Sequence, residues 1–139
     1  MARSHEPLIR LARFKVEELQ KQMAELDRSK AALNNQIERL EASVPEEQAV
    51  AEESKDGFLA YGSYAQAVIK RKENIRLSLS EVEVQADDLR ERLSSAFQEL
   101  KKYEILEERR LAQIEDAVRK SEQDELDEIA QIRHHRRSN

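Results

Sequence analysis

The 139-residue chain contains no cysteine and no tryptophan, and only 4% of its residues are aromatic. Without cysteine it can form neither disulfides nor thiolate metal sites, which fits a reducing compartment. No run of about 18 apolar residues is present, so we expect no segment to span a membrane. Residues 1–6 do not resemble the start of a signal peptide. These absences predict a soluble, cytoplasmic protein without a wide globular core.

Motifs of catalysis are also missing. The sequence has no Gly-rich phosphate loop and no nucleophile elbow. His5 lies far along the chain from His134 and His135, so the three histidines make a poor metal triad. The net charge of −5 disfavours general binding to nucleic acid. We therefore predict no enzymatic activity, no cofactor and no metal site.

What the chain does have is an apolar stripe along residues 9–44 and again along 58–103. The spacing alternates between three and four, and 23 of its 25 positions are apolar, where 39% hydrophobic composition would fill about ten by chance. Lys30 and Lys72 are the two exceptions. Such a stripe stays on one face of a helix that supercoils against a partner. Disorder is the alternative interpretation of so polar a chain. The strict heptad phase argues against it, because a disordered segment has no need to keep such a phase.

Both glycines, Gly57 and Gly62, lie between the main parts of the two stripes. The sequence therefore predicts an all-α fold, a single coiled-coil domain over residues 1–139 in which two long helices form an antiparallel hairpin. We expect helix 1 over about 6–55, a turn at 56–62, and helix 2 over about 63–133. Pro45 predicts a kink or break near 43–45, because an interior proline removes a backbone hydrogen bond.

Heptad phase restricts the hairpin register to a few choices, and charge helps to select among them. A turn centred near residue 51 would set Lys30 against Lys72 across the seam. A turn centred near residue 58 sets Lys30 opposite Ala86 and Lys72 opposite Val44, which we prefer because each lysine can extend its head to water. In this register Glu6 lies near Arg110, and the longer C-terminal helix overhangs the hairpin beyond that point.

The overhang keeps an apolar stripe, although two of its steps lengthen to eight residues. Spacings of eleven residues straighten or reverse a supercoil. An acidic run at 122–128 gives way to a basic run at 133–137. A helix with an apolar stripe and no internal partner is expected to bind another protein. The stripe consists of Leu111, Ile114, Val118, Leu126, Ile129 and Ile132.

A second candidate surface, near the predicted turn, contains Tyr61, Tyr64, Val68 and Ile69. Tyr61 and Val68 occupy stripe positions and could simply close the end of the coil. Tyr64 and Ile69 fall outside the strict stripe, which leaves them available to a partner. The basic, apolar stretch 9–15 could be read as a membrane-surface helix, but its phase continues that of the coiled coil.

The C-terminal helix resembles the end of FliJ proteins. The resemblance lies in KYEILEERR at residues 102–110, EQ at 122–123, LDEIA at 126–130 and Arg133. Chain length, the two-helix hairpin and the aromatic-rich start of helix 2 agree with it. Members of this family are small cytoplasmic components of the bacterial flagellar type III export apparatus. The chain departs from the family pattern in having no tryptophan and no aromatic residue in helix 1 after Phe14.

The resemblance implies a role in flagellum biogenesis and motility. FliJ proteins resemble the central stalk of rotary ATPases, insert the end with both termini into a hexameric export ATPase ring, contact the membrane-embedded export gate protein and escort export chaperones. The implied location is the cytoplasm, peripherally at the membrane export apparatus. Whether the export system is flagellar or an injectisome is left open. The implied ATPase-ring contacts are Arg10, Arg13, Arg109, Arg110, Leu111, Ile114, Val118, Leu126, Ile129 and Arg133, and the implied gate contacts are Tyr61, Tyr64, Val68 and Ile69.

Two other functions fit the same pattern. The chain could be an export chaperone or escort that holds clients without stimulating an ATPase, in which case the hairpin tip would carry the binding. It could also be a structural spacer that dimerises through parallel coils. Lys30 and Lys72 would then face their own copies, which costs stability, so we expect a monomer when the chain is free.

Overall fold

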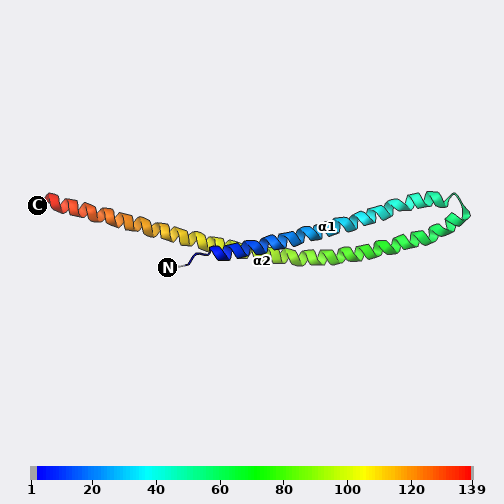
Figure 1. Ribbon diagram of the computed structural model, residues 1–139, viewed down its shortest axis with the longest axis horizontal. Helices are drawn as coiled ribbons and strands as arrows, with labels where there is room; N and C mark the ends of the chain where they lie inside the picture. Colours follow the sequence, from blue (N-terminus) through cyan, green and yellow to red (C-terminus); the bar gives the residue numbers. More distant parts are fainter. Residues whose placement is uncertain (1–2, 139) are drawn as a thin grey trace. The chain divides into compact units, whose positions relative to one another are not determined.

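The computed structural model describes residues 3–138, which form two helices (Figure 1). Helix α1 spans Glu6–Ala51, with 46 residues, and helix α2 spans Lys55–Ser138, with 84 residues. The described residues contain no strand. The predicted all-α fold of two long helices packed against each other is confirmed.

The turn between the helices is shorter than expected and lies earlier in the chain. It consists of residues 52–54, and the prediction of a turn at 56–62 was wrong. Ser54 acts as the N-cap of α2, since its Oγ accepts the Gly57 N–H at 3.0 Å. Gly57 and Gly62 are both helical, and neither has a positive φ. A glycine costs a helix only about 1 kcal/mol, so the cap at Ser54 decides where α2 begins.

Helix α1 continues through Pro45 to Ala51, so the predicted break at 43–45 does not occur. Proline leaves the carbonyl four residues earlier without its helical donor. Contacts with α2 hold this part of α1 in place. The Tyr64 hydroxyl donates to Ser43 Oγ, and Lys72 Nζ lies 3.0 Å from Glu41 Oε1. Both contacts lie on the N-terminal side of Pro45 and connect this part of α1 to α2.

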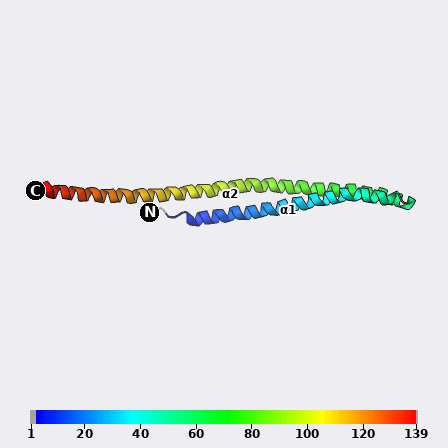
Figure 2. The same cartoon turned by 90° about the horizontal axis from the view of Figure 1, so that it is seen from above.

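Val16–Ser95 form one compact unit, and the chain on either side of this range forms a second. In the first unit α1 and α2 run antiparallel and side by side (Figures 1 and 2). Every predicted stripe position in it is buried or half-buried except Phe58, which is 67% exposed. Phe58 was wrongly predicted to lie in the seam: its spacing fits the stripe, but it lies in the first turn of α2, next to the turn at 52–54. In the second unit, Ala12 and Ala96 are buried seam residues.

The two seam lysines are each half-buried and paired with a glutamate of the other helix. Lys30 forms an ion pair with Glu83, and Lys72 forms one with Glu41. The lysine stems pack in the seam while the ammonium groups reach its edge. Across residues 3–138, neither helix has a stretch that is long and apolar enough to cross a bilayer.

Candidate functional site

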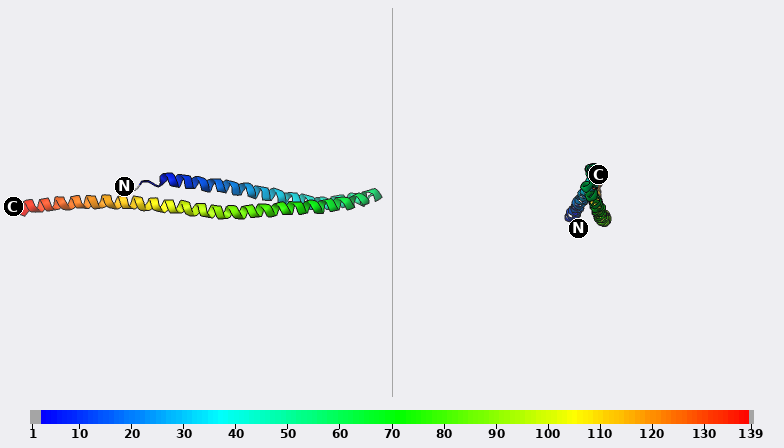
Figure 3. Two further views of the ribbon diagram at one scale, coloured as in Figure 1. Left: turned by 90° about the horizontal axis from the view of Figure 1, so that it is seen from below. Right: turned by 90° about the vertical axis from the view of Figure 1, so that its right-hand side faces the viewer.

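The last part of α2 is a long stretch of helix without a buried face. Every residue from 111 to 138, hereafter the unpaired segment, is exposed. Figure 3 shows this orange-to-red stretch of α2 with no helix beside it. Helices in water usually bury one apolar face, so this exposed apolar stripe makes the unpaired segment a candidate protein-binding surface. The exposed stripe residues are Leu111, Ile114, Val118, Leu126, Ile129 and Ile132.

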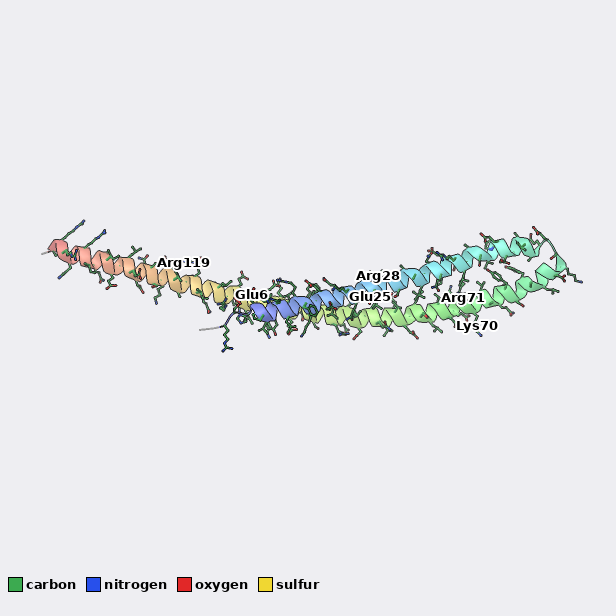
Figure 4. All side chains as sticks on the ribbon, in the orientation of Figure 1. Glu6, Glu25, Arg28, Lys70, Arg71 and Arg119 are labelled. Carbon is green, nitrogen blue, oxygen red and sulfur yellow. The ribbon has the colours of Figure 1, made fainter. Side chains whose placement is uncertain are left out.

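Charged residues of the unpaired segment pair along their own helix. Arg119, labelled in Figure 4, lies 3.4 Å from a carboxylate oxygen of Glu115 and 3.4 Å from one of Asp116. Gln123 Nε2 donates to Asp127 Oδ1 at 3.1 Å. Such i,i+3 and i,i+4 pairs support an isolated helix by a few tenths of a kcal/mol each. They leave the apolar stripe open.

A polar junction marks the place where α1 begins beside α2. The Glu107 carboxylate accepts the His5 backbone N–H at 2.5 Å and the Arg110 Nε–H at 2.7 Å. It also lies near the first turn of α1, where free N–H groups favour a negative charge. Only 14% of the Glu107 side chain is exposed. The unpaired segment starts immediately after this junction.

These contacts change the acidity of the Glu107 carboxyl. The Arg110 guanidinium, followed by the His5 backbone N–H, lowers the pKa of Glu107 from 4.5 to about 2. In the seam of the other unit, the Lys30 ammonium likewise lowers the pKa of Glu83. Both carboxylates are therefore ionised at neutral pH and serve as fixed anchors between the two helices.

The five arginines implied as ring contacts are not equivalent. Arg10 is exposed and lies 3.6 Å from Glu6, labelled in Figure 4, on the same helix. Arg110 is half-buried, and its guanidinium is held by Glu107. It is therefore already engaged within the chain. The other three, Arg13, Arg109 and Arg133, are exposed.

The four residues implied as gate contacts also differ. Ile69 is 58% exposed and faces solvent, whereas Val68 is 4% exposed and belongs to the core. Tyr61 and Tyr64 are half-buried, and the Tyr64 hydroxyl is occupied by Ser43. The structure thus brings Tyr64 to α1, although its sequence position suggested a free side chain.

Three exposed apolar residues close to the turn were not among the predicted partner contacts. Val50, Phe58 and Leu59, hereafter the tip cluster, are 59%, 67% and 68% exposed. The signal that could have found them was Ser54: placing the N-cap there puts Phe58 and Leu59 in the first turns of α2, beyond the packed part of the seam.

A further unpredicted feature lies on α2 just before the unpaired segment. A shallow hollow of about 500 Å³ has an apolar floor that includes Phe97 and Ile105, with Lys101, Lys102 and Arg109 among its other lining residues. Within residues 3–138, no three His, Asp or Glu side chains converge so that they could hold a metal ion. The surfaces described above suit contact with other proteins.

Comparison with known proteins gives one match. The family model of the flagellar FliJ protein matches residues 2–139, essentially the whole chain. No curated protein and no solved structure matches the chain.

Proposed function

The chain belongs to the FliJ family of flagellar export-apparatus proteins, and from this premise we propose that it is the non-enzymatic coiled-coil stalk of a type III export ATPase. In this proposal it binds a hexameric ATPase ring, promotes ring assembly and ATP turnover, and couples the ring to the export gate. Export chaperones are further partners. The chain acts in the cytoplasm, at the membrane export apparatus.

The observation that carries the proposal is the unpaired segment. It is regular helix throughout, it keeps an apolar stripe, and none of its residues is buried. A helix of this kind needs a partner that surrounds or flanks it. The lumen of a ring supplies apolar and charged side chains from several subunits to one inserted helix.

The mechanism of such a stalk is mechanical and allosteric. One helix inside a ring of six subunits contacts them unequally, because a single helix has no six-fold symmetry. It shifts the conformational equilibrium of a subunit only if it binds the alternative states with different affinities. A stalk of this kind favours the assembled ring and biases which subunits hydrolyse ATP.

The tip cluster supports the proposed coupling to the export gate. Val50, Phe58 and Leu59 expose apolar surface near the turn, and Ile69 adds to it on α2. All four belong to the compact unit that does not include the unpaired segment. We assign contact with the export gate to these residues rather than to Val68, whose side chain is buried.

Truncation after Arg110 tests the ATPase contact. It removes the unpaired segment and retains the junction at Glu107, so the hairpin is expected to stay folded. We expect the truncated chain to lose stimulation of the purified export ATPase from the same organism, measured as ATP turnover and ring assembly. A matched control, Phe58→Ser with Leu59→Ser, changes the tip cluster and is expected to stimulate normally. Unchanged stimulation by a folded, truncated chain would refute the stalk function.

The tip cluster favours one alternative, an export chaperone escort without ATPase stimulation. Exposed apolar residues close to a turn can hold helical clients. In that case the Phe58→Ser, Leu59→Ser variant loses chaperone binding in a pull-down, and truncation after Arg110 changes neither ATP turnover nor chaperone binding. The two functions therefore predict opposite results for the same pair of variants.

A further inference from the structure

A glutamate lies in the middle of the apolar stripe of the unpaired segment. At 3.6 residues per turn, Glu122 lies within about 20° of Leu111 and of Ile129 around the helix axis. It therefore belongs to the same face as these apolar residues and is not part of the polar flank. Like its neighbours it is exposed.

The stripe is nearly symmetric about Glu122. The nearest apolar residues, Val118 and Leu126, lie four positions before and after it. The next, Ile114 and Ile129, lie eight positions before and seven after. Consequently a parallel in-register pair and an antiparallel pair of two such segments both match the apolar residues with one another. Both arrangements also set Glu122 opposite its own copy.

No cation of the described residues neutralises Glu122. The nearest basic residue along this face, Arg119, is engaged with Glu115 and Asp116, each at 3.4 Å. Among the ion pairs formed within residues 3–138, none includes Glu122. Two unneutralised carboxylates facing each other in a narrow seam repel and each loses water, so they oppose self-pairing.

We propose that Glu122 is a specificity residue: it excludes a second copy of the chain from the stripe and selects a partner surface that is apolar with one Lys or Arg opposite Glu122. In coiled coils, a polar residue at a single core position specifies register and oligomer state at some cost in stability, and charges beside the core set the choice of partner. The inference rests on the proposed function only for the identity of that partner, the lumen of the export ATPase ring. Exclusion of the second copy does not depend on it.

Self-association tests the first half. We expect Glu122→Leu to dimerise in analytical ultracentrifugation with a dissociation constant at least tenfold lower than that of the unmodified chain. Asp124→Leu is the matched control, since it removes the same charge and adds the same side chain about 200° away around the helix. It is expected to behave like the unmodified chain. Equal association of the two variants would overturn the proposal.

A charge-reversal mixture sharpens the result. Glu122→Lys alone still sets like charges opposite each other and is expected to stay monomeric. Mixed with the unmodified chain, it places the introduced ammonium group against the Glu122 carboxylate of the other copy, so heterodimers are expected in the mixture. Circular dichroism of each variant checks that the helix is retained. Absence of heterodimers, with both chains folded, would count against repulsion at this position.

Binding to the ATPase tests the second half. We expect Glu122→Lys to weaken binding to the purified export ATPase at least tenfold, and Glu122→Gln to weaken it less, because an amide still accepts a hydrogen bond. If truncation after Arg110 abolishes binding but Glu122→Lys leaves it unchanged, the stalk function stands and the role of Glu122 is refuted. If the truncated chain binds as well as the full chain, the stalk function fails, and self-association alone decides the exclusion of a second copy.

Discussion

Charged side chains at the coiled-coil seam of this chain are paired within the molecule. Glu107 is the most constrained of them. Its carboxylate accepts the His5 backbone N–H, immediately before α1, and the Arg110 side chain at once. It thereby fixes the start of one helix to a defined position on the other.

The pH dependence of this junction follows from the lowered pKa of Glu107. The folded value is about 2, below the ordinary 4.5, so the ionised carboxylate contributes stability that is present above about pH 4.5 and is lost as the pH falls towards 2. We expect Glu107→Gln to lower the thermal midpoint at pH 6 and to have little effect near pH 2. Thermal unfolding of both chains across this range is the measurement. A difference that stays constant with pH would show that the carboxylate charge is not what anchors α1.

The sequence predicted which residues lie in the seam better than it predicted which residues they pair with. The seam positions and the two interrupting lysines were identified from spacing alone, and the structure keeps Lys30 and Lys72 apart. Glu41, Glu83 and Glu107 were not identified as partners, since heptad spacing repeats and restricts the register to a few choices. Which glutamate a lysine reaches depends on a shift smaller than one heptad.

At the scale of helices, the boundary of α2 depends on a cap rather than on its glycines. The Ser54 side chain accepts a hydrogen bond from the Gly57 N–H. Both glycines therefore lie within α2. Sequence reasoning placed the turn on the glycines, because glycine commonly ends a helix. A serine is an equally good sign of a helix start, since its side chain caps the N–H three residues later. In this chain α2 begins after Ser54, not after the glycines.

The two glycines offer a matched pair of substitutions. A Cβ added at Gly62 meets nothing within 4 Å, whereas one at Gly57 meets Ser54 Oγ at 2.9 Å and Ala51 Cα at 3.3 Å. We expect Gly62→Ala to stabilise the chain by about 0.5–1 kcal/mol, since alanine is the better helix former. Gly57→Ala should gain less or destabilise. Urea unfolding of both variants decides the matter, and equal gains would mean that the turn rearranges freely.

At the scale of the whole chain, the packing of α1 against α2 ends at the Glu107 junction, whereas α2 itself continues to Ser138. Tertiary packing supplies most of the stability of helices in water, so we expect amide hydrogen exchange to be slow in the seam and much faster across 111–138. Addition of the export ATPase should slow exchange in the unpaired segment specifically. Uniform slow exchange to residue 138 in the free chain would show that another contact covers this segment.

The sequence predicted the two-helix hairpin, the longer second helix and an apolar stripe beyond Arg110 that α1 does not bury. Near the turn, the expected exposure of Ile69 is observed, whereas the exposure of Phe58 was not predicted. Exposure of Phe58 and Leu59 depends on where the turn falls, and a displacement of a few residues moves a side chain from the seam to solvent. Surfaces next to turns are therefore the least predictable part of such a chain.

The position of the unpaired segment at the C-terminal end of α2 also has a consequence for biosynthesis. Residues 6–110 contain both arms of the hairpin and emerge from the ribosome first. At about 5–20 residues per second, translation of residues 111–138 takes roughly one to six seconds, whereas helical folds with local contacts form in microseconds to milliseconds. The two arms of the hairpin can thus begin to pair before the unpaired segment has left the ribosome.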